Sequence, residues 1–175
     1  IPDSVTNIGD SAFSGCTGFT EITIPDSVTS IGEHAFRGCT SLTGVTIPDS
    51  VTSIYYGAFE DCTSLTSVTI PDSVTEICYE AFSNCTSLES ITIGSGVENL
   101  GNGWIDSCRR LTNITVSPDN KTYSSVDGVL FNKDKSELSA YPIGNRRSSY
   151  TIPDGVEKVG KKAFYGCRYI ETLII

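Results

Sequence analysis

The sequence predicts an elongated repeat solenoid, and three patterns indicate it. The phrase Ile-Pro-Asp-Ser-Val-Thr begins at Ile1, Ile24, Ile47 and Ile70, and this interval of about 23 residues is typical of a solenoid unit. A second phrase, Ala-Phe-x-x-Cys, recurs in step with the first. Apolar residues also recur at matching positions of successive units. One unit cannot enclose these side chains, whereas stacked units bury them in one shared core.

Five positions of the unit are apolar in each of the first five units. Stacking places each set in one column, so we expect every column to form a continuous ladder of core side chains. The columns are Val5, Val28, Val51, Val74 and Val97; Ile8, Ile31, Ile54, Ile77 and Leu100; Phe19, Leu42, Leu65, Leu88 and Leu111; Ile22, Val45, Val68, Ile91 and Ile114; and Ile24, Ile47, Ile70, Ile93 and Val116.

Each unit contains one segment that is typical of a short strand. In the second unit, Leu42 is followed by Val45 and Ile47, and the last two alternate with polar residues as a strand does. Pro48 ends the strand, because proline has no amide hydrogen to donate. The strands of successive units are therefore predicted to lie parallel on the concave face of the solenoid.

The segment Gly32–Phe36 comes half a unit away from this strand. It is too short for a stable helix, so we expect a single helical or 3-10 turn on the convex face. Gly38–Thr40 then leads back toward the next strand.

The two phrases together resemble the BspA-like leucine-rich repeats, also called the Treponema pallidum type. The resemblance rests on Ile-Pro-Asp-Ser-Val-Thr-x-Ile-Gly followed by Ala-Phe-x-x-Cys-x-x-Leu, and it covers nearly the whole chain. It implies a leucine-rich repeat solenoid with parallel strands on the concave face. Members of this family are typically surface or secreted proteins of bacteria and some protozoa, and several are implicated in adhesion.

The regular pattern breaks after Val116. The apolar run Val129–Phe131, the polar run Asn132–Lys135 and the segment Ser136–Tyr141 predict a β-hairpin. This insert either alters the sheet or forms a binding loop, because insertions in solenoids map to one face. Arg146 and Arg147, which follow it, are interpreted as part of a solvated loop. We divide the single domain into regular repeats (1–116), an irregular hairpin insert (117–150) and a final regular repeat (151–175).

The net charge of −9 is spread unevenly. Residues 1–105 contain thirteen acidic residues and one basic residue, whereas residues 106–175 contain eight acidic and eleven basic residues. The acidic part disfavours nucleic acid as a partner, since phosphates require Lys and Arg for neutralisation. The sequence contains no apolar run long enough for a membrane-spanning helix, so we expect no membrane span.

Seven cysteines are present, and six of them fall at one repeat position. A cysteine that recurs among core columns is best interpreted as a small buried hydrophobe, so we expect free thiols rather than disulfides. Cys78 lies outside this column.

No catalytic constellation is recognisable, and we expect no cofactor and no metal. His34 is the single histidine, and a Ser-His-Asp triad would have to use it. The sequence contains no phosphate-binding glycine motif. The aspartates that recur after each proline, such as Asp26, Asp49 and Asp72, either bind Ca²⁺ or cap turns, and the preceding proline favours turn capping.

The alternation of the strands identifies the side chains that point out of the concave sheet. One column is all threonine and its neighbour varies, so variation there would encode recognition of a partner. The predicted binding face consists of Glu21, Thr23, Gly44, Thr46, Ser67, Thr69, Ser90, Thr92, Asn113 and Thr115.

These observations favour a non-enzymatic module that binds a host or matrix protein or a glycan at the cell surface or outside the cell. Two alternatives are a structural spacer that presents another domain, and a non-catalytic domain of a larger surface enzyme. The chain has no methionine, and no polar capping repeat is recognisable, which indicates a piece of a longer protein. Exposed solenoid ends would also allow self-association.

Overall fold

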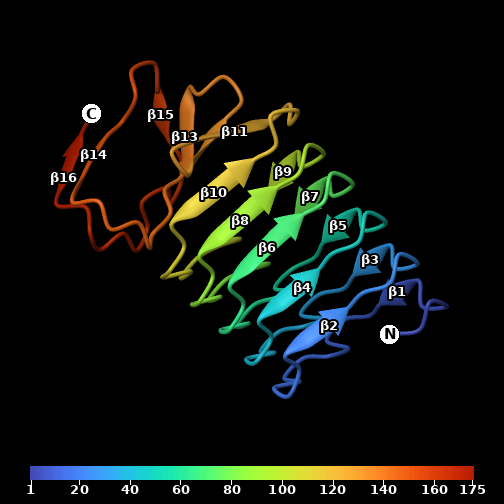
Figure 1. Ribbon diagram of the computed structural model, residues 1–175. Coiled ribbons are helices and arrows are strands. Elements are labelled where there is room, and N and C mark those ends of the chain that lie inside the picture. Colours follow the sequence, from blue (N-terminus) through green and yellow to red (C-terminus); the bar gives the residue numbers. More distant parts are fainter.

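The computed structural model describes residues 1–175 as a solenoid of about seven coils, built from short strands and turns without any helix (Figure 1). The first five coils stack in a straight row, and the last part of the chain departs from that row. No element of the structure is a helix long and apolar enough to cross a bilayer.

The predicted parallel strands of the concave sheet are present, one in each regular coil. They are β2 (Glu21–Thr23), β4 (Gly44–Thr46), β6 (Ser67–Ile70), β8 (Ser90–Ile93) and β10 (Asn113–Val116). Hydrogen bonds join β2 to β4, and β6 to β8 to β10, and equivalent residues face one another, as Thr69, Thr92 and Thr115 do. Their alternating burial points Val68 and Ile70 into the core.

A second parallel ladder runs along the other side of each coil, and the sequence analysis did not predict it as strand. It is a five-stranded sheet of two-residue strands that pair in register. The strands are β1 (Asn7–Ile8), β3 (Ser30–Ile31), β5 (Ser53–Ile54), β7 (Glu76–Ile77) and β9 (Asn99–Leu100).

The helical or 3-10 turn expected on the convex face is not found, and consecutive turns occupy that segment instead. Two residues there have a positive φ, His34 (54°) and Gly38 (69°), and such a conformation interrupts a right-handed helix. The amides also alternate between partners. Phe36 donates to the Ala58 carbonyl of the next coil at 2.8 Å, whereas Arg37 donates to His34 within its own coil at 3.0 Å.

The core is a set of ladders, as predicted. Phe36, Phe59 and Phe82 are fully buried and stack with centroid separations of 5.2 and 5.3 Å. The repeated cysteines lie beside them. Cys62 donates its thiol hydrogen to the Phe36 carbonyl at 3.2 Å, and Cys85 does the same to Phe59 at 3.2 Å.

The insert is a three-stranded antiparallel meander of β11 (Tyr123–Val126), β12 (Val129–Asn132) and β13 (Glu137–Ala140). The predicted hairpin, β12–β13, is confirmed. The other hairpin, β11–β12, was missed. It turns at Asp127 and Gly128, whose φ values are 51° and 82°. Asp-Gly is a preferred dipeptide for such two-residue turns.

The meander ends the concave ladder. The Ile114 amide of β10 donates to the Gly128 carbonyl at 3.0 Å, and the Val116 amide donates to the Ser125 hydroxyl at 3.0 Å. The outer edge of β10, where another strand would otherwise pair, is therefore covered by the insert.

The last coil stacks on the insert through two further parallel pairs. The strand β13 pairs with β15 (Lys158–Val159), and β14 (Ser149–Thr151) pairs with β16 (Thr172–Ile174). The strand β14 begins two residues before the boundary predicted at residue 151. This part has its own small core, which is formed by Val129, Phe131, Leu138, Tyr141, Tyr150, Ile152 and Ala163.

Candidate functional site

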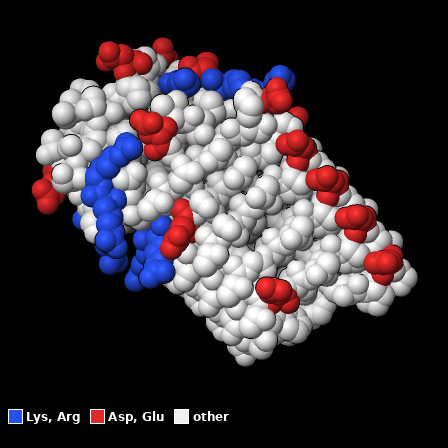
Figure 2. Space-filling model, in the orientation of Figure 1, with Lys and Arg blue, Asp and Glu red and all other residues white.

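A groove of about 730 Å³ lies on the concave sheet, over β2, β4, β6 and β8. Seven of the ten residues predicted for the binding face line it. They are Glu21, Thr23, Gly44, Thr46, Ser67, Thr69 and Thr92. Figure 2 shows this face as mostly uncharged surface, with a row of acidic residues along one edge and isolated acidic side chains within it. The lining of the groove includes three carboxylates, Glu21, Asp49 and Asp72, and no basic residue. The groove is therefore a polar, largely uncharged surface.

The other three predicted residues lie outside the groove. Ser90 is half-buried, and Asn113 and Thr115 are exposed on β10. The Asn113 amide donates to the Thr115 hydroxyl at 2.9 Å, so these two side chains already satisfy each other. Asn113 also lies beside the Asp127-Gly128 turn, because a Cβ on Gly128 would come within 2.8 Å of Asn113 Oδ1.

The threonine hydroxyls fall into two groups. Several outside the groove donate to the coil before them, as Thr43 does to the Thr20 carbonyl at 3.0 Å and Thr66 to the Thr43 carbonyl at 3.2 Å. The groove threonines, Thr23, Thr46, Thr69 and Thr92, form no hydrogen bond within the protein through their hydroxyls. A row of hydroxyls at the spacing of the coils thus faces the groove without an intramolecular partner.

One aspartate at the acidic edge of the groove accepts a hydrogen bond from a backbone amide. The carboxylate of Asp72 accepts the Ser95 amide at 2.5 Å, and this hydrogen bond lowers the pKa of Asp72. Asp72 thus bonds to the turn of the next coil and not to its own turn, and Asp26 and Asp49 form no such bond, so capping of the turn after each proline stays a prediction. No group of three or more His, Cys, Asp or Glu side chains is arranged to hold a metal ion.

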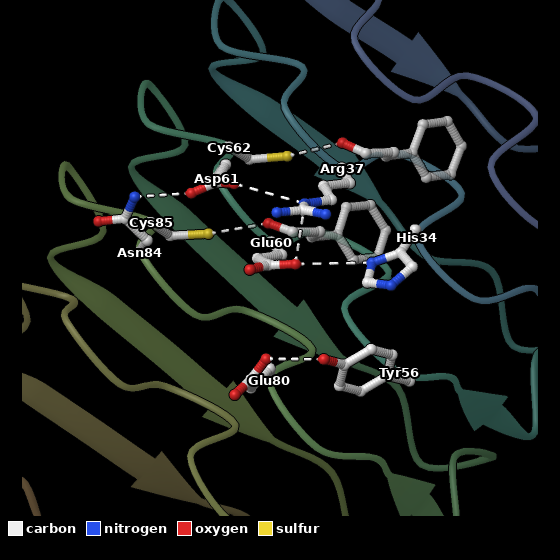
Figure 3. A network of polar contacts seen from close by, with 11 residues as sticks. His34, Arg37, Tyr56, Glu60, Asp61, Cys62, Glu80, Asn84 and Cys85 are labelled. Carbon is white, nitrogen blue, oxygen red and sulfur yellow. Dashed lines mark hydrogen bonds and ion pairs between the residues drawn. The ribbon is translucent and has the colours of Figure 1, made fainter.

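On the convex side, polar side chains from neighbouring coils meet around His34 (Figure 3). Arg37 lies 3.0 Å from Glu60 and 3.5 Å from Asp61, and His34 Nδ1 lies 3.5 Å from Glu60. The His34 ring packs edge-on against Tyr56. The histidine is half-buried by these neighbours. Cys62 and Cys85, which Figure 3 also draws, donate to the Phe36 and Phe59 carbonyls and form no contact with His34. The arrangement is that of a structural ion-pair network.

The ladder thiols are poorly suited to nucleophilic chemistry. Burial raises the pKa of Cys62 to about 12 and that of Cys108 to about 12. Since the thiolate is the reactive form, these cysteines are protonated near neutral pH. All seven cysteines are free, and the four inner ones of the ladder (Cys39, Cys62, Cys85 and Cys108) are fully buried, as predicted.

A second hollow, of about 510 Å³, lies between the fifth coil and the last coil. It arises because the insert has a shorter convex turn. Leu138 and Tyr141 are three positions apart, whereas the equivalent Val159 and Phe164 of the next coil are five positions apart. The charged groups that line the hollow are mostly paired, since Lys162 binds Asp106 at 2.7 Å and Lys158 binds Glu137 at 3.0 Å.

Two features of these surfaces escaped the sequence analysis. The Asp-Gly dipeptide between β11 and β12 is a sequence signal that predicts this turn. The role of Asn120 is not predictable in this way, because no other asparagine lies one repeat interval away from it. It is fully buried and donates to the Gly94 and Val97 carbonyls at 2.8 and 3.0 Å. Its oxygen accepts the amides of Thr122 and Tyr123.

The coil geometry, the ladders and the repeated phrases agree with one protein family. The family model for the BspA-type leucine-rich repeat region matches residues 1–135 and 144–175 in six copies. The chain belongs to the BspA-type leucine-rich repeat family. The two matched ranges leave out residues 136–143, which contain β13 and the shortened convex turn of the insert.

Solved structures of bacterial leucine-rich repeat proteins share the fold of this BspA-type chain. A leucine-rich repeat protein from Eubacterium ventriosum is 30% identical with a TM-score of 0.83, over 97% of this chain and 45% of that one. A leucine-rich cell surface protein from Faecalibacterium prausnitzii is 31% identical with a TM-score of 0.73, over 100% and 59%. The pneumococcal vaccine antigen PcpA is 25% identical with a TM-score of 0.73, over 97% and 50%.

The BspA-type chain thus spans about half the length of these structures. Among curated proteins none matches it.

Proposed function

We propose that this chain is a non-enzymatic binding module of a bacterial surface protein, and that the concave groove holds its partner. The row of threonine hydroxyls without intramolecular partners carries the proposal. Hydroxyls both donate and accept hydrogen bonds, so this row suits a polar partner such as an extended segment of a matrix protein or a neutral glycan.

The fold supports a recognition role for this face. The groove threonines stand on strands that pair in register, β2 with β4 and β6 with β8, so these side chains are held in place before a partner arrives. A rigid surface loses little conformational entropy on binding. The surface location is supported by two of the similar structures, one a cell surface protein and the other a vaccine antigen. An adhesive role fits both the face and the location.

Replacing three groove threonines tests the proposal. The variant Thr46→Val/Thr69→Val/Thr92→Val keeps the shape and the β-propensity of each residue but removes the hydroxyl. Binding to immobilised collagen, laminin and a glycan array would be measured by surface plasmon resonance. We expect a loss of about ten-fold to about a hundred-fold in affinity, because each of the three lost hydrogen bonds is worth about 0.5 to about 1 kcal/mol.

The matched control is Thr29→Val/Thr52→Val/Thr75→Val. These threonines are also exposed and equally spaced, but they lie outside the groove. The hydroxyls of Thr29 and Thr75 donate to the preceding coil instead. Unchanged binding by the groove variant would exclude this face as the site. Absence of any binding by the unmodified chain would favour the alternative function, a spacer that presents another domain.

A further inference from the structure

Five arginines gather on one edge of the solenoid, at the turns that lead into the concave strands of the last coils. This arginine edge comprises Arg109, Arg110, Arg146, Arg147 and Arg168. Figure 2 shows basic side chains near the starts of β10 and β14, at the end of the face opposite to the row of acidic residues. All five side chains are exposed.

The repeat shows that these arginines replace neutral residues. The residue after the repeated cysteine is Thr17, Thr40, Thr63 and Thr86 in the first four coils, and Arg109 and Arg168 follow the cysteines of the later coils. The next position is Gly18, Ser41, Ser64 and Ser87, and then Arg110. The fold of this turn therefore does not require a basic residue, since four coils form it with threonine and serine or glycine.

The insert brings the arginine pairs together although they are far apart in the sequence. The Gly144 amide donates to the Leu111 carbonyl at 2.8 Å. A Cβ on Gly144 would come within 2.4 Å of the Arg110 carbonyl carbon, so only glycine permits this approach. Arg146 in turn lies 5.9 Å from the centre of the Tyr169 ring, which follows Arg168 in the chain.

Little negative charge opposes this edge within the protein. Of the five arginines only Arg110 forms an ion pair, at 3.9 Å from Glu89, and both of those side chains are about two-thirds exposed. Glu171 is the other acidic residue of these turns, and its own carboxylate forms no ion pair. The cluster is thus a concentrated positive surface in a chain of net charge −9.

We propose that the arginine edge binds a sulfated polysaccharide, as a second site beside the concave groove. Guanidinium groups bind sulfate oxygens through two parallel hydrogen bonds. The arginines come from three successive coils at one edge of the solenoid, so a linear chain with repeated sulfates can contact several of them. The serine and threonine residues at the same positions of the earlier coils extend the edge with groups that bind sugar hydroxyls.

Other polyanions fit this edge less well. Duplex nucleic acid and anionic membranes are wide, and they would meet the first 105 residues, which carry thirteen acidic residues and one basic residue. That charge repels a broad negative surface. A narrow polysaccharide can follow the arginine edge alone and avoid the acidic coils.

The test uses the repeat's own residues. In the variant Arg109→Thr/Arg110→Ser/Arg146→Ser, two of the replacements are the residues that earlier coils carry at those positions, so the turn geometry is retained. The control is Lys121→Ser/Lys135→Ser/Lys161→Ser, which removes the same positive charge from exposed lysines that form no ion pair. Binding of the whole chain to immobilised heparin would be measured at about 0.15 M NaCl, where long-range attraction is screened beyond roughly 8 Å.

We expect the unmodified chain and the lysine control to bind heparin, and the arginine variant to bind about ten-fold more weakly, which corresponds to roughly 1.4 kcal/mol over three exposed charges. Hyaluronan, which has no sulfate, and poly-glutamate should bind much more weakly than heparin. Equal losses in both variants would show a response to net charge alone and overturn the site. Equal binding of poly-glutamate would overturn the sulfated ligand in favour of an acidic protein.

The threonine variant of the groove separates this proposal from the function proposed above. Its hydroxyls lie away from the arginine edge, so its affinity for heparin should be unchanged. A loss of heparin binding in that variant would place the polysaccharide in the groove and overturn the separate site.

Discussion

The regular stack (1–116) and the C-terminal part (117–175) both bury aromatic side chains between coils, but they pack these side chains differently. In the stack, identical residues pile on one another, and the phenylalanine rings lie nearly parallel, at 9° between Phe36 and Phe59 and 2° between Phe59 and Phe82. In the C-terminal part, Tyr141 stacks on Phe164 at 24° and meets Tyr150 edge-on. The main core has 32 buried residues and the second core only seven.

The difference shows what a departure from the repeat does. In the insert, one convex turn is two residues shorter and a hairpin is added. These two changes terminate the concave ladder and begin a separate core. The same departure opens a hollow on one side and joins the arginine pairs on the other. Strict repetition in the first coils thus provides a uniform surface, whereas irregularity concentrates distinct side chains.

Truncation of a core ring should have the largest effect, and it should differ between the two regions. Phe59→Ala removes a fully buried ring between two stacked neighbours, so we expect a loss of about 4 kcal/mol in the free energy of unfolding. Phe164 is half-buried, and Phe164→Ala should lose about 2 kcal/mol. Urea unfolding followed by circular dichroism measures both, and equal losses would contradict the idea of a weaker second core.

Replacement of Asn120, which joins the regular stack to the insert, should have the second largest effect on stability. Asn120→Ala leaves two carbonyls of the fifth coil and two amides of the insert without their partner, and we expect a loss of about 3 kcal/mol. The control Asn102→Ala replaces an exposed asparagine. It should change stability only slightly, within about 0.5 kcal/mol. Hydrogen exchange should show faster opening of β11 and β12 than of β6 in the Asn120 variant. Uniform opening of all strands would mean that Asn120 does not join two separable regions.

Alkaline pH should weaken the stack more than the C-terminal part. Burial raises the pKa of Cys62 to about 12, and that of the less buried Cys167 to about 11. Below about pH 9 the thiols are protonated in both states, and between about pH 9 and about pH 12 only the unfolded chain ionises, so stability falls as pH rises.

Each buried thiol of the stack should contribute about 2 kcal/mol to this loss near pH 10.5. Cys62→Ala/Cys108→Ala should therefore show a smaller difference in urea midpoint between about pH 8 and about pH 10.5 than the unmodified chain. An identical pH dependence of the two proteins would show that the ladder thiols do not cause the loss.

The smallest effect should come from the ion pair that bridges the two regions. Lys162 Nζ and Asp106 Oδ2 are 2.7 Å apart, but the lysine side chain is 43% exposed. Solvent screening should therefore limit the pair to a contribution of about 1 kcal/mol or less. A double-mutant cycle with Lys162→Ala and Asp106→Ala measures it. A coupling free energy well above that value would mean that this ion pair is a main contact between the two regions.

The repeated apolar positions predict the core, whereas the second parallel ladder and the convex turns depend on contacts between coils that one unit does not show. Val51 and Ile54 were placed in the core correctly, because every coil offers the same environment to the same position. The sequence around His34 predicts a helical turn, but its positive φ goes with a hydrogen bond to the next coil, from the His34 amide to the Tyr56 carbonyl, that one unit does not show. The approach of Gly144 to the Arg110 backbone depends on the path of the insert, and nothing at the repeat interval records that path.

The alternation of amide partners on the convex face has a mechanical consequence. Because each coil is held largely by hydrogen bonds to its neighbours, pulling along the axis would peel coils off one at a time from an end. Every coil released would lengthen the chain by roughly 80 Å, at about 3.4 Å for each of its residues. Such a molecule would yield in steps under load and so absorb a sudden pull between two attached surfaces.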